Sequence, residues 1–125
     1  MLAASRAFSG YSVDSMDAAR EFYGEVLGVR VTPDHGMLFL ELEGGNRVLL
    51  YPKDDHRPAG FTVLNFPVPD VEAAVDALTA RGVSFERYEG FPQDDKGVVR
   101  DPDHGPAIAW FKDPAGNVLS VIEDD

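Results

Sequence analysis

The chain has 125 residues, no cysteine, and 22 Asp and Glu against 11 Lys and Arg, which gives a formal net charge of −11. This length fits one domain with a hydrophobic core of useful size, and the lack of cysteine excludes disulfides, thiolate metal sites and cysteine nucleophiles. The acidic balance excludes nucleic-acid binding, and no apolar run reaches the roughly 18 residues that cross a bilayer.

The first half of the chain opens with a predicted strand at 7–13 that leads into a predicted helix. Asp14 or Ser15 can cap the start of this helix, and Gly28 can end it. The helix face expected to pack on a sheet is the apolar stripe of Ala19, Phe22, Tyr23, Val26 and Leu27. The remaining strands of this half are predicted at 29–33, 37–43 and 47–51.

The second half follows the same plan, beginning with a predicted strand at 61–68. Asp70 can cap the helix that follows, and Gly82 can end it. The apolar stripe of this helix consists of Val71, Ala74, Val75 and Leu78. The remaining strands are predicted at 83–86, 107–112 and 117–123.

The two halves form an internal repeat. Residues 13–19 align with 68–74, and residues 45–51 align with 116–122. Each half therefore reads as β-α-β-β-β, which predicts an α+β fold. We expect one domain over 1–125 that is built from two modules, residues 1–56 and 57–125.

The predicted strands have two different faces. Side chains alternate along a strand, and one parity is almost wholly apolar, as at Val48, Leu50, Leu119 and Val121, so we expect it to carry the helices. The other parity mixes apolar and polar residues, which is typical of a small-molecule site. Tyr51 falls on this second face and Tyr11 on the helix face. The candidate ligand contacts contributed by the strands on the second face are Phe8, Ser12, Leu49, Tyr51, Val63, Asn65 and Ser120.

The repeat and two motifs together resemble the vicinal oxygen chelate superfamily, which includes glyoxalase I, extradiol dioxygenases, and fosfomycin- and bleomycin-resistance proteins. The motifs are FYGEVLG at 22–28 and FKDPAGN at 111–117. The resemblance implies a cup-shaped mixed sheet with the helices on its outer face. It also implies a homodimer in which modules pair across chains.

In metal-dependent members of this superfamily, His, Glu or Gln side chains bind a divalent cation inside the cup. The matching positions in this chain carry Phe8, Leu49, Val63 and Ser120. None of the four offers the imidazole, carboxylate or thiolate that such cations need. The histidines at 35, 56 and 104 fall in predicted loops, where Asp-His clusters more often serve turn formation. We therefore expect no metal and no cofactor.

Two further features are open to two interpretations each. Loop 87–106 is long for this domain, so it is either a surface segment with a partial strand at 97–100 or a lid that closes on a ligand through Tyr88 or Phe91. Trp110, the only tryptophan, is either a core residue or part of the wall of the cup. Tyr88, Phe91 and Trp110 complete the set of candidate ligand contacts.

The main hypothesis is a metal-independent, small-molecule-binding protein of the glyoxalase/bleomycin-resistance type that sequesters an apolar or cationic compound. The alternative is a glyoxalase- or dioxygenase-like enzyme, acting as a lyase, isomerase or oxidoreductase, with Glu41, Asp101 or Asp103 as a base. A structural module whose cup is filled by its own side chains is a third class. Residues 1–6 lack a secretory signal pattern, so we expect a cytoplasmic protein.

Overall fold

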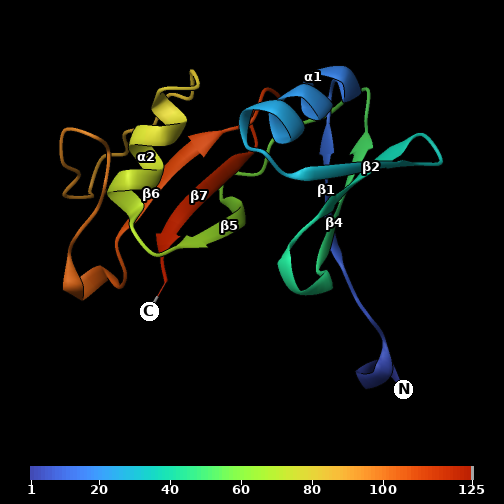
Figure 1. Cartoon of the computed structure of the whole chain (residues 1–125), viewed down its shortest axis with the longest axis horizontal. Coiled ribbons are helices and arrows are strands. Elements are labelled where there is room, and N and C mark those ends of the chain that lie inside the picture. Colours follow the sequence, from blue (N-terminus) through green and yellow to red (C-terminus); the bar gives the residue numbers. More distant parts are fainter. Residues whose placement is uncertain (125) are drawn as a thin grey trace. The chain divides into compact units, whose positions relative to one another are not determined.

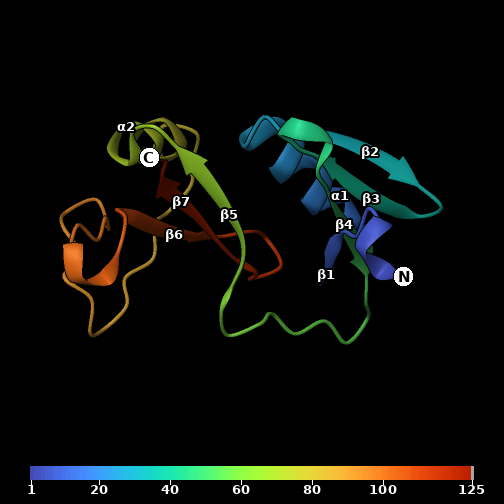
Figure 2. The same cartoon turned by 90° about the horizontal axis from the view of Figure 1, so that it is seen from below.

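The computed structural model describes residues 1–124 and divides into two compact units, Met1–Arg57 and Pro58–Asp125, hereafter the first and the second unit. Each unit holds one small mixed sheet and one main helix that runs alongside it, α1 and α2 respectively (Figures 1 and 2). This arrangement confirms the predicted α+β class.

The first unit contains a four-stranded sheet with the order β1-β4-β3-β2, in which β1 and β4 are parallel and the other neighbours are antiparallel. All four predicted strands are present. Its elements are η1 (Leu2–Ala4), β1 (Ser9–Val13), α1 (Met16–Arg20), η2 (Glu21–Val26), β2 (Arg30–Asp34), β3 (Met37–Glu41), η3 (Glu43–Gly45) and β4 (Arg47–Pro52).

The helix of the first unit begins and ends where the sequence predicts. The Ser15 hydroxyl accepts a hydrogen bond from Ala18 N at 3.2 Å, so Ser15 rather than Asp14 provides the cap. Gly28 follows the helix with a φ of 72°, a value that favours glycine. The helix packs on the sheet through Tyr23, which is fully buried and whose hydroxyl lies 2.8 Å from that of Tyr11.

The close pairing of β1 with β4 depends on a glycine. A Cβ atom added at Gly10 would lie 3.0 Å from the Leu49 carbonyl oxygen and 3.1 Å from the Leu49 Cβ. We expect Gly10→Ala to lower the free energy of unfolding by about 1–3 kcal/mol, because the two strands must move apart. Urea denaturation measures this. Gly60→Ala is the control, since nothing lies within 4 Å of its added Cβ; equal losses in both variants would contradict the crowding.

The second unit contains a three-stranded sheet with the order β5-β7-β6, in which β5 and β7 are parallel and β6 and β7 antiparallel. Asp70 caps α2 by accepting a hydrogen bond from Ala73 N at 3.1 Å. The elements are β5 (Thr62–Val68), α2 (Val71–Thr79), η4 (Pro102–His104), β6 (Ile108–Lys112) and β7 (Val118–Glu123).

The strand predicted at 83–86 does not form. Only one bridge remains there, from Phe85 to Phe111, with a hydrogen bond from Glu86 N to the Trp110 carbonyl at 2.8 Å. The reason is competition for the free edge of β6, because Val99 forms two backbone hydrogen bonds with Ile108 further along that edge. The partial strand expected at 97–100 is accordingly present only as bridges at Val99.

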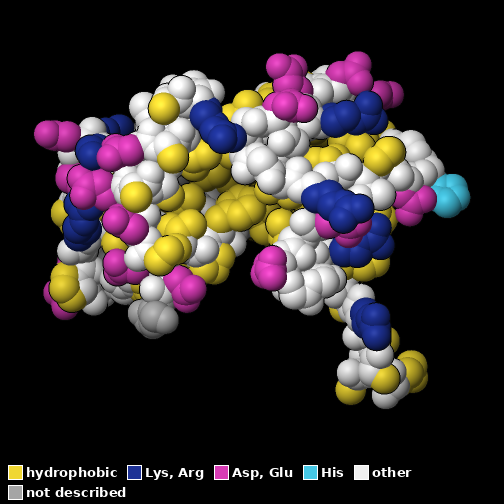
Figure 3. All heavy atoms as spheres, in the orientation of Figure 1, with side chains coloured by type: hydrophobic (Ala, Val, Ile, Leu, Met, Phe, Trp, Pro, Cys, Tyr) yellow, Lys and Arg dark blue, Asp and Glu magenta, His cyan; other side chains and the backbone are white. Residues whose placement is uncertain are grey.

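The core of each unit lies between its helix and one face of its sheet. In the second unit, Val71 and Val75 of α2 are buried together with side chains of β6 and β7, namely Ala109, Phe111, Leu119 and Val121. In the first unit, Val48 and Leu50 are buried on the same face as Tyr11. The helix-bearing parity of these strands is therefore as predicted. Acidic side chains are spread over both units, with Lys and Arg among them (Figure 3).

Candidate functional site

The open face of the first sheet, opposite α1, carries the four candidate residues of that unit. The register pairs Gly10 with Leu49 and Ser12 with Tyr51, so Leu49, Ser12 and Tyr51 share the face that Tyr11 does not occupy. Phe8 belongs to the same face, because its ring lies 5.3 Å from that of Phe39, which pairs with Leu49.

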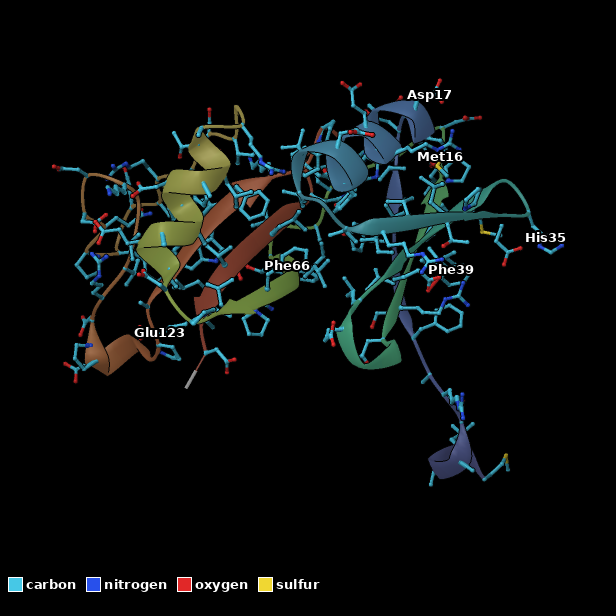
Figure 4. All side chains as sticks on the ribbon, in the orientation of Figure 1. Met16, Asp17, His35, Phe39, Phe66 and Glu123 are labelled. Carbon is cyan, nitrogen blue, oxygen red and sulfur yellow. The ribbon has the colours of Figure 1, made fainter. Side chains whose placement is uncertain are left out.

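A basic group covers part of this open face. The Arg47 guanidinium lies 3.7 Å from the centre of the Phe39 ring, and Arg47 Nε donates to Glu41 Oε1 at 2.7 Å. Glu41, one of the carboxylates considered as a base, is therefore held in an ion pair. Figure 4 shows Phe39 on its strand, and it shows His35 at the tip of the β2–β3 hairpin, pointing away from the sheet.

A histidine from outside the strands reaches the open face of the first sheet. His56 lies in the segment after β4, and its Nδ1 is 2.6 Å from the Ser12 hydroxyl. Both side chains are half-buried. The sequence gives no local signal for this pair, because the two residues are 44 positions apart and His56 lies among turn-forming residues.

The open face of the second sheet carries Asn65, Ser120 and Trp110, which the register places side by side on β5, β7 and β6. The fully buried Ser120 hydroxyl donates to Asn65 Oδ1 at 2.5 Å, so these two polar side chains satisfy each other. Val63 lies at an irregularity of register between Thr62 and Leu64. The bulge breaks the strict alternation from which the position of Val63 was predicted.

A pocket of about 650 Å³ lies in the second unit. Three of the ten candidate residues line it: Tyr88, Phe91 and Trp110. Their rings form one cluster, with the Tyr88 and Phe91 rings 5.4 and 5.1 Å from that of Trp110. The half-buried Trp110 is thus part of the wall. The lining consists of Pro58, Ala59, Gly60, Phe61, Thr62, Tyr88, Phe91, Trp110, Lys112, Gly116 and Val118.

Hydrogen bonds hold loop 87–106 in the shape that presents its aromatic rings. The Gln93 amide accepts from Tyr88 N at 2.7 Å and donates to the carbonyls of Glu86 and Gly97 at 3.0 and 2.8 Å. The Arg87 guanidinium donates to the carbonyls of Asp94 and Asp95 at 2.6 and 2.5 Å. These hydrogen bonds hold the part of the loop that contributes Tyr88 and Phe91 to the pocket lining.

The Asp94 carboxylate accepts hydrogen bonds from within the loop, at Lys96 N and Val98 N. Burial raises the pKa of Asp94, but hydrogen bonds from Val98 N and Lys96 N, together with the Arg100 guanidinium, lower the pKa more, so it lies below its ordinary value. A lowered pKa in the folded state stabilises the fold above the unfolded pKa, which is about 3.9 for Asp. This contribution is lost as the pH falls through the folded value.

We therefore expect acidification below about pH 4 to loosen loop 87–106, because the protonated Asp94 holds Lys96 N, Val98 N and Arg100 less strongly. Trp110 fluorescence reports on the change, because it is the only tryptophan and contacts Phe91 of the loop. Asp94→Asn should be less stable at neutral pH and should lose part of the acid dependence. An unchanged acid transition in this variant would show that other carboxylates cause it.

One ion pair includes a residue of the pocket lining. Lys112 Nζ is 3.4 Å from Glu86 Oε1, and among the described residues of the lining Lys112 alone is charged. Burial raises the pKa of the Tyr88 hydroxyl, and the Glu86 charge adds to this rise while Lys112 opposes it. Tyr88 therefore keeps its proton at neutral pH and can donate a hydrogen bond.

The remaining lining residues are positioned by the turn that precedes β7. Buried Asp113 accepts hydrogen bonds from Ala115 N and Asn117 N at 2.9 and 2.8 Å and from the Asn117 amide at 3.0 Å. This turn places Gly116 so close to Pro58 that an added Cβ would lie 3.2 Å from the Pro58 ring. The motif at 111–117 is visible in the sequence, but its contribution to the pocket is not.

The residues present do not fit the metal centre that the resemblance implies for metal-dependent relatives. Phe8, Leu49 and Val63 have no donor atom in their side chains, and the Ser120 hydroxyl is engaged by Asn65. Within the described part of the chain, no three His, Asp or Glu side chains are grouped as metal ligands. Among residues 1–124, no helix has both the length and the apolar character of a membrane span.

Comparison with known proteins gives a consistent result for the fold. The model of the family described as Glyoxalase/Bleomycin resistance protein/Dioxygenase superfamily matches residues 7–121. No curated protein matches the sequence. A glyoxalase family protein from Enterococcus faecalis is 21% identical, with a TM-score of 0.74 over 98% of this chain and 100% of that one.

Two further solved structures have the same fold. A member of the glyoxalase/bleomycin resistance protein/dioxygenase superfamily from Sphaerobacter thermophilus is 23% identical, with a TM-score of 0.72 over 96% of this chain and 98% of that one. TnmS3, an antibiotic binding protein from Streptomyces sp. CB03234, is 22% identical, with a TM-score of 0.66 over 98% of each chain. At these identities the likeness concerns the fold.

Proposed function

The chain belongs to the glyoxalase/bleomycin resistance protein/dioxygenase superfamily, and within it we propose a metal-independent protein that binds a small, largely apolar ring compound. The membership confirms the resemblance drawn from the two motifs and the repeat. The observation that carries the proposal is the pocket of the second unit, whose lining includes four aromatic rings, those of Phe61, Tyr88, Phe91 and Trp110. Apolar walls with a few polar groups are typical of ligand pockets.

The shape and chemistry of this pocket support an apolar ligand more than a cationic one. Among the lining residues that the structure describes, the one charged side chain is the cation Lys112, and none is a carboxylate. The net charge of −11 serves solubility. TnmS3, which shares the fold, is an antibiotic binding protein, and this supports a small organic molecule as the ligand of this chain.

A fluorescence titration tests the proposal, because Trp110 is the only tryptophan and lies in the pocket wall. We expect binding of 2-naphthamide to change the fluorescence of Trp110 saturably, with a Kd in the micromolar to low millimolar range. The protein should first be treated with a chelator and checked for metal content. Absence of binding by both fluorescence and calorimetry would contradict the proposal, and binding that requires added metal would contradict its metal independence.

A second candidate function, a cofactor-free isomerase or lyase, is favoured by the Ser12–His56 pair. Imidazole is the most common general base of enzymes, and this one is hydrogen-bonded to a hydroxyl on an open sheet face. Asp101 is a weaker candidate, because its carboxylate caps a short helix by accepting from Asp103 N at 2.9 Å. Turnover that is lost in His56→Gln and kept in Asp101→Asn would establish this second function.

Three broader properties belong to the same proposal. We propose that the two units act together as one domain, that the protein is a homodimer, and that it works in the cytoplasm. The family resemblance supports the dimer. Size-exclusion chromatography with light scattering tests it, and a mass of about 13.6 kDa, that of one chain, would contradict it.

A further inference from the structure

Lys112 is a charged residue in a pocket lining that is otherwise largely apolar. Lys112 is the last residue of β6 and lies two positions after Trp110, so both side chains project from the same face of the sheet. Both residues line the pocket. A ring compound that packs on Trp110 would therefore have an ammonium group within reach of its substituents.

From this arrangement we propose that the pocket selects ring compounds that carry an anionic substituent, and that Lys112 binds the anion. The proposal rests on the proposed function and adds the charge of the ligand to it. Lys112 is a specificity-determining residue in this view, because the aromatic walls bind the ring whatever its substituent.

The surroundings of Lys112 leave its ammonium available. Its carboxylate neighbour, Glu86, lies 3.4 Å away, and the two side chains are 46% and 29% exposed, so their pairing is weak. Lys96, by contrast, is held by both Glu72 and Asp76 at 3.0 and 2.9 Å. An ammonium has three donors, so Lys112 can contact an anion without leaving Glu86.

Tyr88 gives the pocket lining a second donor. Tyr88 and Lys112 line the same pocket, and the charges of Glu86 and Lys112 both act on the pKa of the Tyr88 hydroxyl. Because Tyr88 stays protonated at neutral pH, it can donate to the anion that Lys112 attracts. The pocket lining therefore offers two donors, the Lys112 ammonium and the Tyr88 hydroxyl.

The net negative charge of the protein opposes the proposed preference for anionic ligands. A net charge of −11 repels anions at long range, but at physiological ionic strength charges are screened over about 8 Å. Selection of an anion must therefore come from contacts inside the pocket. We expect added salt to weaken binding of an anionic probe and to leave a neutral probe of the same shape largely unaffected.

Three probes with one ring system separate the contributions: 2-naphthoate, 2-naphthamide and 2-naphthylmethylammonium. We expect the wild-type protein to bind naphthoate about tenfold more tightly than the amide, and the ammonium compound least, as one charge-assisted hydrogen bond predicts. Lys112→Met should make naphthoate and amide equal while keeping the aliphatic stem. Lys112→Arg should restore the preference, and Glu86→Gln should strengthen it.

The control is Lys53→Met, which removes the same charge from an exposed site of the first unit. Equal loss of naphthoate binding in the two methionine variants would overturn the proposal, because net charge rather than contact would be responsible. Equal binding of all three probes by the wild type would also overturn it and would leave the proposed function standing. Binding of none of the probes would overturn both.

Discussion

Replacing Trp110 with alanine is expected to weaken binding of 2-naphthamide about 10- to 100-fold. The substitution removes the ring that Tyr88 and Phe91 both contact, with ring centres 5.4 and 5.1 Å away. An aromatic side chain buries about 150–250 Å² when it is covered, which corresponds to several kcal/mol at about 25 cal/mol per Å². Only part of this is available to the ligand, because the half-buried Trp110 already contacts its neighbours.

Isothermal titration calorimetry measures this effect, since the variant has no tryptophan left to report binding. Trp110→Phe is the matched control, because it keeps an aromatic ring at the same place and should lose less than half of the binding free energy lost by the alanine variant. Wild-type affinity in Trp110→Ala would place the ligand elsewhere and remove the basis of the proposed function. Far-UV circular dichroism of both variants separates loss of the pocket from loss of the fold.

The faces of the strands were predictable from the sequence because alternation is a local property. Val48 and Leu50 follow the apolar parity of β4, and Leu119 and Val121 follow that of β7, and all four are buried against the helices. The same parity places Leu49 and Tyr51 on the opposite face. The helix caps Ser15 and Asp70 are also local, since each accepts from an amide three residues later.

Features that depend on the path of a long loop were not predictable in this way. The strand expected at 83–86 alternates apolar and polar residues, yet it keeps one bridge because Val99 occupies the adjoining edge of β6. Which segment takes an edge depends on contacts between distant parts of the chain. The same reason explains why Val63 could not be placed, because a bulge shifts the register of β5 before Leu64.

The candidate site was predictable only in part. The aromatic residues of loop 87–106 drew attention by their type, and Tyr88 and Phe91 line the pocket. Phe61 and Lys112 also line the pocket but were not among the candidate contacts, although alternation puts Phe61 on the face of Asn65 and Lys112 on the face of Trp110. Pro58 and Gly116 both line the pocket, and they lie close together although they are far apart in the sequence. Sequence spacing carries no signal for such a meeting.

The second large effect is expected at the turn that precedes β7. Asp113→Ala is expected to lower the free energy of unfolding by about 2–4 kcal/mol, because a charged acceptor of several hydrogen bonds is removed. Asp113 is 5% exposed and Asn117 is 2% exposed. The alanine variant would leave Ala115 N and both donors of Asn117 without this carboxylate, in a place where water has little access.

Urea denaturation of Asp113→Ala measures the loss, and two further variants separate its causes. Asp113→Asn keeps the shape and one acceptor oxygen, so it should lose about half as much. Asp101→Ala removes a comparable turn carboxylate that accepts from Asp103 N at the surface, and it should cost only about 0.5–1 kcal/mol. Equal losses at Asp113 and Asp101 would show that burial does not strengthen the turn. Because the turn also holds Gly116 against Pro58, Asp113→Asn should weaken binding of 2-naphthamide even under conditions in which the variant stays folded.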